Sequence, residues 1–181
     1  MPYIAPLDPA AADSKIVATL DVVKARLGMV PDLYATLAKT PAALKALLAI
    51  NEAIAEGGLS AKEREIVALA TSQANGCQYC LSAHTLLGKN VSLSTRETEL
   101  ARAAAGGDAR AAAIAQLTRA LVEQRGHDAR SALDDSKAAG RSEGDLLEIA
   151  VKVAATTLTN YVNNVARTEI DFPVVEPQLA A

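Results

Sequence analysis

Residues 59–90 read LSAKEREIVALATSQANGCQYCLSAHTLLGKN, and this stretch predicts the fold. Ser60 and Glu63 have the spacing of a capping box, in which the serine side chain caps the Glu63 amide and the glutamate reaches back to the serine amide. A helix is therefore expected to start there. Asn75-Gly76 breaks this helix, and a second one can start at Cys77 and end within the same stretch. We expect a hairpin of two helices over residues 59–90.

The same helix punctuation recurs along the rest of the chain. No run of β-branched and aromatic residues alternates with polar ones, as a half-buried strand would require. The chain has 39 alanines, four tyrosines, one phenylalanine and no tryptophan, which favours thin, closely packed helices over a bulky β-sandwich core. We therefore expect an all-α helical bundle. Its further helices are expected to begin near residues 13, 31, 41, 94, 108, 129 and 142.

A length of 181 residues fits one all-helical domain over residues 1–181. Residues 1–12 contain three prolines and are expected to form an extended N-terminal arm. The tail from Asp171 onward holds two more prolines and is expected to lie over the surface.

Residues 142–170 echo the hairpin when the chain is shifted by 83 residues. The shift places Glu65 on Glu148, and the polar break that ends the first helix recurs at Thr159-Asn160. We interpret residues 142–170 as a degenerate second copy of the hairpin that has lost the chemistry of the first. The two cysteines and the histidine of the first copy correspond to Asn160, Asn163 and Arg167.

Charge and hydropathy exclude two classes of partner. The formal net charge is −3, with 18 Lys and Arg against 21 Asp and Glu, so no broad basic surface for nucleic acid is expected. The uncharged stretch 66–88 is long enough to span a bilayer, but polar residues interrupt it, and we expect a buried helix and no membrane association. No secretory signal is visible at residues 1–12, so a cytoplasmic location is expected.

The two cysteines, Cys77 and Cys80, have the spacing of redox or metal chemistry and are too few for a disulfide scaffold. On a helix, Cys77, Cys80 and His84 fall within about 60° of one another. A thiolate in the first helical turn is stabilised by unpaired backbone amides, and His84 lies one turn from Cys80, where it can share a proton. The Cα separation at this spacing can approach the roughly 5.5 Å that a disulfide needs, so the pair can cycle between dithiol and disulfide.

Glu65 lies twelve residues before Cys77, where the hairpin can bring its carboxylate over the cysteine helix. Burial among its apolar neighbours at 66–69 is expected to raise the pKa of Glu65 toward the range useful for proton transfer. The alternative is a helix-surface pair with Lys62 or Arg64.

Two other interpretations of the motif stay open. Zinc needs four ligands, and Cys77, Cys80, His84 and Glu65 could supply them, although structural zinc more often uses two C-x-x-C pairs or a second histidine. Buried structural thiols would need neither this spacing nor a histidine on the same face. We expect no metal and no cofactor. His127 lies at a helix boundary and is expected to be a solvated cap.

The pattern E-x11-C-x-Y-C-x3-H, over Glu65 to His84, resembles the signature of the alkylhydroperoxidase D-like branch of the carboxymuconolactone decarboxylase superfamily. The resemblance implies an all-helical fold built from a duplicated unit and assembled as homodimers, trimers or hexamers. Tyr79 stands where the best-known member has a second histidine, which implies a shorter proton relay. Core packing is the first explanation for Tyr79 and for Tyr161. Further segments resemble the peroxidase-related subgroup: Leu27-Gly28-Met29-Val30-Pro31, Asn160-Tyr161, Asn163-Asn164 and Asp171-Phe172-Pro173.

The resemblance also implies roles that the residues alone leave open. Cys80 resembles the cysteine that attacks peroxide, Cys77 the resolving cysteine, and Glu65 with His84 the proton relay. We therefore expect a thiol-dependent peroxidase that reduces small or organic peroxides and is itself reduced by an outside dithiol. The alternatives are a thiol-disulfide oxidoreductase with a non-peroxide substrate, and a non-redox pocket like that of the decarboxylases, which typically lack the cysteine pair.

Overall fold

Helices make up most of the chain, as the sequence predicts. The computed structural model describes residues 1–8, 10 and 12–178, and this part holds nine α-helices and no β-strand. The all-α prediction is therefore confirmed. The helices are α1 (Ser14–Leu27), α2 (Asp32–Leu37), α3 (Pro41–Ala55), α4 (Ala61–Ala74), α5 (Gln78–Asn90), α6 (Thr95–Arg102), α7 (Ala109–Glu123), α8 (Arg130–Ala138) and α9 (Glu143–Ala166).

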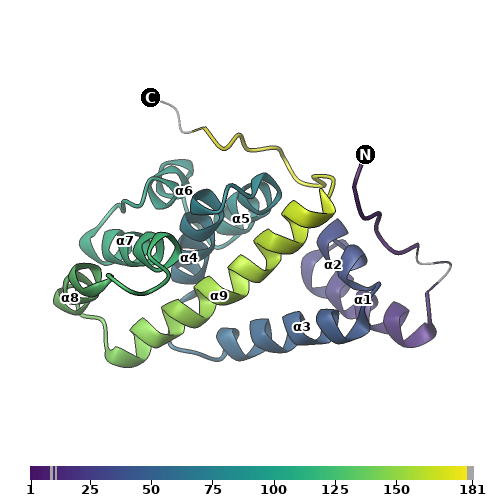
Figure 1. The fold of residues 1–181 in the computed structure, drawn as a ribbon, viewed down its shortest axis with the longest axis horizontal. Helices are drawn as coiled ribbons and strands as arrows, with labels where there is room; N and C mark the ends of the chain where they lie inside the picture. Colours follow the sequence, from purple (N-terminus) through teal and green to yellow (C-terminus); the bar gives the residue numbers. More distant parts are fainter. Residues whose placement is uncertain (9, 11, 179–181) are drawn as a thin grey trace.

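The long helix α9 organises the bundle. It crosses the molecule diagonally, with α4 to α8 on one side and α1 to α3 on the other (Figure 1). It contacts α4, α5, α7 and α8 in the first group and α2 and α3 in the second. Helix α4 packs against α5, α6, α7 and α9, so it forms the centre of the larger group. Among the described helices, none combines the length and hydropathy that a bilayer-spanning segment requires.

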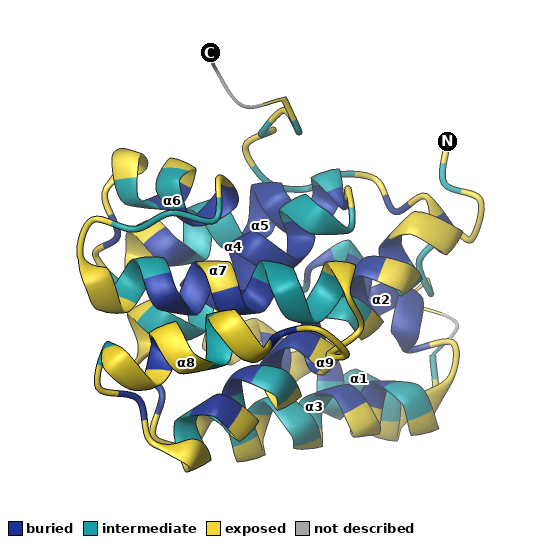
Figure 2. Cartoon of the chain, turned by 60° about the vertical axis from the view of Figure 1, so that its left-hand side comes forward, coloured by how far each residue is buried: buried dark blue, intermediate teal, exposed yellow. Residues whose placement is uncertain are grey.

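Buried residues form two clusters, one on each side of α9. The first joins α4, α7 and α9 through fully buried side chains such as Leu69, Ile114 and Ile149. The second lies where α2 and α3 meet the start of α5, and it contains both cysteines. The inner faces of α4 and α5 are almost continuously buried in Figure 2. The cysteine motif therefore sits inside the molecule, between the two groups of helices.

Local capping signals position most helix starts. The predicted capping boxes of α4 and α6 are both present, at Ser60 and Ser94, and Asp108 caps α7 through the amide of Ala111. Gly76 has φ +63°, a left-handed conformation that an L side chain rarely adopts, and it turns the chain between α4 and α5. The predicted break between these two helices is confirmed.

The predicted helix break at Thr159-Asn160 is wrong, because α9 continues unbroken from Glu143 to Ala166. The hydroxyl of Thr159 donates to Thr156 O at 2.8 Å, and the amide of Asn160 donates to Ser72 Oγ at 3.2 Å. These partners satisfy the polar groups while the backbone stays helical. The segment 142–170 thus holds one continuous helix, Glu143–Ala166, and no second hairpin, and the sequence echo itself stays a prediction.

Helix α6 ends at Arg102, and Ala104 beyond it has φ +53°. One further prediction near a helix surface is also wrong. Tyr161 was expected in the core but is 62% exposed, because it lies on the outer face of α9. His127 is exposed, as expected of a solvated cap.

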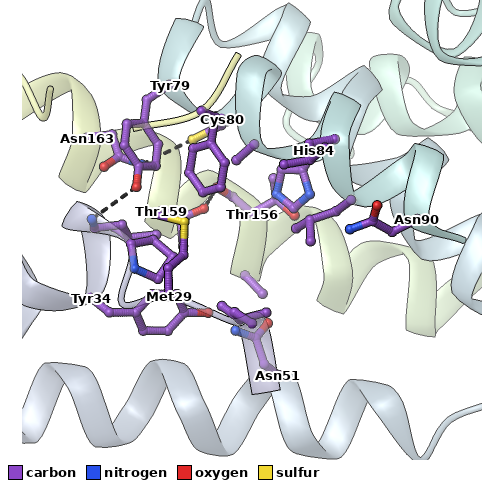
Figure 3. A pocket seen from close by; sticks show the side chains of 18 of the residues that line it. Met29, Tyr34, Asn51, Tyr79, Cys80, His84, Asn90, Thr156, Thr159 and Asn163 are labelled. Carbon is purple, nitrogen blue, oxygen red and sulfur yellow. Dashed lines mark hydrogen bonds between the residues drawn. The ribbon is translucent and has the colours of Figure 1, made fainter. Parts of the chain in front are cut away.

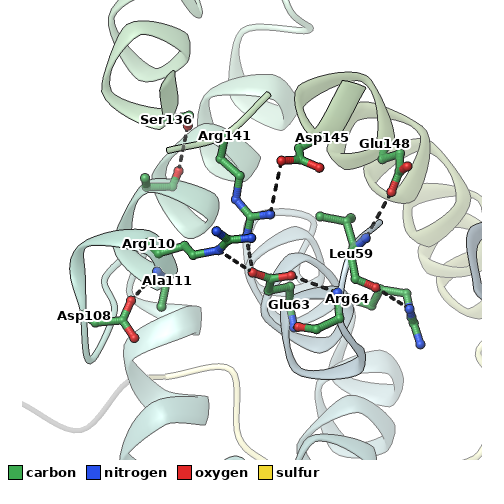
Figure 4. A network of polar contacts seen from close by, with 12 residues as sticks. Leu59, Glu63, Arg64, Asp108, Arg110, Ala111, Ser136, Arg141, Asp145 and Glu148 are labelled. Carbon is green, nitrogen blue, oxygen red and sulfur yellow. Dashed lines mark hydrogen bonds and ion pairs between the residues drawn. The ribbon is translucent and has the colours of Figure 1, made fainter. Parts of the chain in front are cut away.

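A buried arginine fixes the start of α9 to α4. The side chain of Arg141 has no exposed surface, and it pairs with Glu63 and, at 3.7 Å, with Asp145 (Figure 4). Arg110 from α7 joins the same carboxylate at 2.8 Å. Burial raises the pKa of Glu63, but hydrogen bonds from Arg110, Ser60 and Arg141 outweigh it and lower the value to about 2.

The two chain ends lie against the bundle. The tail from Asp171 crosses the surface as expected: Asp171 accepts a hydrogen bond from the amide of Asp32 at 2.7 Å, and the amide of Val175 donates to Ser82 Oγ at 3.0 Å. The N-terminal arm is irregular, and Leu7 N donates to the carbonyl of Ala35 at 3.0 Å. Pro9, also assigned to this arm, lies outside the described residues.

Candidate active site

The hairpin of α4 and α5 brings the four predicted site residues together. Cys77 is the N-cap of α5, Cys80 lies in its first turn and His84 one turn further on. Glu65, from α4, accepts a hydrogen bond from His84 Nδ1 at 2.8 Å, and the two side chains are only 15% and 17% exposed. Among the described residues, Glu65 makes no ion pair with Lys62 or Arg64, so the helix-surface alternative does not describe this carboxylate.

The two thiols are free and differ in access. Cys77 is fully buried, and its sulfur accepts a hydrogen bond from the amide of Cys80 at 3.3 Å. Cys80 is 2% exposed but lines a cavity, and Cys77 is not among the lining residues. A small molecule in the cavity thus meets Cys80 first.

Electrostatics also distinguish the two sulfurs. The hydrogen bond from the Cys77 thiol is the largest effect on Cys80, and it lowers the pKa of that thiol. Burial raises this pKa, whereas the charge of His84 and hydrogen bonds from Asn163 and Asn160 lower it. The resulting pKa of Cys80 is about 6. The pKa of Cys77 is raised, first because its thiol donates to Cys80 and second because it is buried. Cys80 is therefore the thiolate of the pair, and Cys77 holds the proton.

Asn163 on α9 completes the site, and the motif alone did not reveal it. Its Nδ2 donates to Cys80 Sγ at 3.3 Å across the two helices (Figure 3). One signal could have found it: the 83-residue shift aligns Cys80 with Asn163. The same shift aligns Cys77 with Asn160, which accepts from Asn75 Nδ2 at 2.9 Å at the end of α4.

The expected upward shift in the pKa of Glu65 is wrong. Burial does raise it, but the charge and hydrogen bond of His84, together with the charges of Lys152 and Arg64, outweigh burial and lower the pKa below its ordinary value. Glu65 is therefore a carboxylate, and it orients the ring of His84 through Nδ1. The positive imidazolium in turn stabilises the thiolate of Cys80.

The cavity beside Cys80 has a volume of about 160 Å³ and lies between α5, α9 and the segment before α2. Cys80, His84, Thr156, Thr159 and Asn163 lie along its wall in Figure 3. Most of its lining is apolar or aromatic: Leu27, Met29, Pro31, Leu33, Tyr34, Tyr79, Ala83, Leu86, Leu87, Ala155 and Phe172. The site can thus take a small, largely apolar molecule next to an acidic thiol.

Tyr79 has the packing role that the sequence predicts. It is 5% exposed, its ring meets Phe172 edge to face at 5.5 Å, and its hydroxyl accepts from the amide of Leu33 at 3.2 Å. The residue thereby fixes the start of α2 and the tail around the cavity.

The geometry gives no ligand set for the zinc alternative. Within residues 1–8, 10 and 12–178, no three His, Cys, Asp or Glu side chains are arranged to hold a metal ion. The Glu65 carboxylate is engaged by His84, and the Cys77 sulfur by the amide of Cys80.

Comparison with known proteins agrees with the motif and the fold. Residues 41–123, which include all four predicted site residues, match the carboxymuconolactone decarboxylase family. This matched region, 83 of the 181 residues, is similar to that family. No curated protein sequence matches it.

Several solved structures share the fold over nearly the whole chain. A peroxidase-related protein with an alkylhydroperoxidase AhpD core from Ralstonia eutropha JMP134 has TM-score 0.85 and 23% identity, covering 94% of this chain and 92% of that one. A peroxidase-related protein from Silicibacter sp. TM1040 has TM-score 0.80 and 24% identity, with coverage of 92% and 91%. The debrominase Bmp8 in complex with 2,3,4-tribromopyrrole has TM-score 0.79 and 20% identity, with coverage of 93% and 91%. The chain thus has the AhpD-like fold.

Proposed function

We propose that the protein is a thiol-dependent peroxidase that reduces small or organic peroxides through a dithiol/disulfide cycle of Cys77 and Cys80. One observation carries the proposal: the acidic sulfur of Cys80 lines an apolar cavity, and its partner thiol lies directly behind it. This arrangement suits a reaction in which the substrate meets one sulfur and the other completes the chemistry.

In the first step the Cys80 thiolate attacks the terminal oxygen of a hydroperoxide. An S–O bond forms and the O–O bond breaks, so Cys80 is oxidised by two electrons to a sulfenic acid and the peroxide is reduced to an alkoxide. The imidazolium of His84 gives its proton to the departing oxygen, which leaves as an alcohol or as water. Glu65 accepts a hydrogen bond from His84 Nδ1 and so holds the imidazole ring in place.

In the second step Cys77 resolves the sulfenic acid. Its thiol, deprotonated through the now neutral His84, attacks the sulfur of Cys80; the S–S bond forms, the S–O bond breaks, and hydroxide leaves as water after taking up that proton. An outside dithiol then reduces the disulfide and returns the pair to two thiols. The cycle needs a reducing compartment, and we place it in the cytoplasm.

Burial favours a small substrate over a protein disulfide. Both sulfurs are at most 2% exposed, so a thiol-disulfide oxidoreductase acting on folded proteins could not bring a substrate disulfide to Cys80 without opening the site. The reductant must likewise present its dithiol on a slender group that enters the cavity. Exposed apolar side chains on α9 support a homo-oligomer, whose copy number the proposal leaves open.

Thiol counting tests the proposal. In the wild-type protein, tert-butyl hydroperoxide should remove two thiols per chain without a crosslink between chains. Cys80→Ser should lose no thiol, and Cys77→Ser should stop at a sulfenic acid that dimedone traps. Because Bmp8 is a debrominase, 2,3,4-tribromopyrrole is the comparison substrate. Thiol oxidation by that compound alone, with none by peroxides, would reject the peroxidase.

A further inference from the structure

Lys152 on α9 is a buried cation that the proposed reaction does not use. It is 8% exposed and lines the same cavity as Cys80. Among the described lining residues it is the single Lys or Arg, and none of them is an Asp or Glu. The cavity therefore favours an anion at this position over a cation.

The ammonium group of Lys152 has no close partner among the described residues. No carboxylate lies within ion-pair distance, and it makes no hydrogen bond. Glu65 acts on it only through its charge, because the near partner of that carboxylate is His84. Burial lowers the pKa of Lys152. The negative charge of Glu65 raises this pKa, and the positive charge of Arg64 lowers it, so the pKa lies below its ordinary value. An unpaired buried ammonium is costly, and an anionic ligand would supply the missing partner.

Lys152 and the residue that contacts the reacting sulfur, Asn163, lie at different levels of α9. Lys152, Thr156, Thr159 and Asn163 line the cavity along successive turns, and Asn163 marks the level of Cys80. Lys152 and Asn163 lie eleven positions apart on the helix, which corresponds to about 16 Å of axial rise between their backbone positions. Figure 3 shows Thr159 and Thr156 between Asn163 and the far part of the cavity. The cavity lining on α5 and α9 also includes the apolar side chains Ala83, Leu86, Leu87 and Ala155.

From this arrangement we propose that the cavity selects an elongated organic hydroperoxide with a carboxylate group at the end remote from the O–O bond. The carboxylate binds the Lys152 ammonium, the apolar chain lies along α9, and the hydroperoxide meets Cys80. This selection rests on the proposed peroxidase function and leaves its chemical steps unchanged. Lys152 is a specificity-determining residue that binds the substrate end away from the reacting atoms.

Octanoate and octanamide are matched probes for this site, since they differ in charge and hardly in shape. Each is tested for its power to slow the alkylation of Cys80 by N-ethylmaleimide in the dithiol protein. Octanoate should give half protection at about one tenth of the octanamide concentration, the preference expected from one charge-assisted contact. The control variant Lys89→Met, at an exposed lysine on α5, should keep this tenfold preference.

In Lys152→Met, the concentrations of octanamide and octanoate that give half protection should become about equal. Lys152→Gln should give the same result, and it serves as the test where the methionine variant does not fold. Equal protection by the two probes in the wild-type protein, or a tenfold preference that persists in both variants, overturns the proposal. Because the assay contains no peroxide, its result is independent of turnover. A failure of tert-butyl hydroperoxide to oxidise Cys80 would instead reject the peroxidase and leave the carboxylate site in place.

Discussion

Asn163 Nδ2 donates to Cys80 Sγ at 3.3 Å, and the two residues lie 83 positions apart in the chain. That separation equals the shift of the sequence echo, so this one corresponding pair is in contact between α5 and α9. The contact places an amide donor from α9 on the sulfur that lines the cavity, where it lowers the pKa of Cys80 after the larger effects of Cys77 and His84.

Replacing Asn163 with Ala should weaken the thiolate of Cys80. The amide stabilises the charged form, so its loss should raise the pKa of Cys80 from about 6 by about one pH unit. The rate of iodoacetamide alkylation against pH measures this value, because only the thiolate reacts. Asn164→Ala, at the exposed neighbouring position, is the control and should leave the profile in place. An identical midpoint in both variants would show that the Asn163 contact has no electrostatic effect.

The Glu63 network predicts a loss of stability in acid. The folded-state pKa of Glu63 is about 2 against an ordinary value of 4.5, so its contribution is complete above pH 4.5 and is lost as pH falls toward 2. A pKa depression of this size corresponds to a stabilising free energy on the order of 3 kcal/mol. The Glu63 side chain is only 13% exposed, so solvent screens this contribution little. Urea unfolding of Glu63→Gln should show a large loss of stability at pH 7, because the buried Arg141 loses its nearer carboxylate and keeps only Asp145 at 3.7 Å. The free energy of unfolding should also depend less on pH below pH 4.5.

Glu97→Gln is the matched control for this prediction. Glu97 occupies the same capping-box position in α6 as Glu63 does in α4, but no arginine pairs with it among the described residues. Its replacement should therefore cost clearly less stability at pH 7. Equal losses in the two variants would assign the effect to the capping box alone and remove the role of Arg141.

The outer face of α9 predicts self-association. Five apolar side chains on this helix are at least 40% exposed: Leu147, Val151, Leu158, Tyr161 and Val165. Their spacing is close to that of a helix–helix seam, and exposed stripes of this kind are typical of interfaces. Light scattering should give an oligomer for the wild-type protein and a smaller species for Leu158→Glu. Val174→Glu, in the exposed tail, should leave the size unchanged. A wild-type monomer near 18.7 kDa at micromolar concentration would contradict the prediction.

Local signals in the sequence were enough to predict the helices that begin with a cap. The serine and glutamate of each capping box lie within one turn, so the pattern that sets the helix start is present in the chain itself. The continuity of α9 could not be predicted this way. Thr159 and Asn160 have the composition of a break, and Asn160 is held in the helix by Ser72, which is 88 residues away.

The candidate site could likewise be predicted only where its residues lie close together in the sequence. Glu65, Cys77, Cys80 and His84 lie on one hairpin, whose short connection brings them together. Asn163 and Lys152 reach the cavity only because α9 packs on that hairpin, and no local pattern encodes this packing. A single lysine within the apolar run after Glu148 was the one local sign of Lys152.

Glu65 should affect the rate of peroxide reduction and leave the fold unchanged. Its carboxylate orients the His84 ring, which in the proposed reaction gives a proton to the departing oxygen. Glu65→Gln keeps the shape and removes the charge, so peroxide-dependent loss of thiols should slow by at least about tenfold, within the range of a positioned acid–base group. Helical content by circular dichroism and oligomer size should stay as in the wild-type protein. Glu99→Gln, an exposed glutamate on α6, is the control and should oxidise at the wild-type rate. If Glu65→Gln also oxidised at that rate, the relay would be rejected and proton transfer would rest on His84 alone.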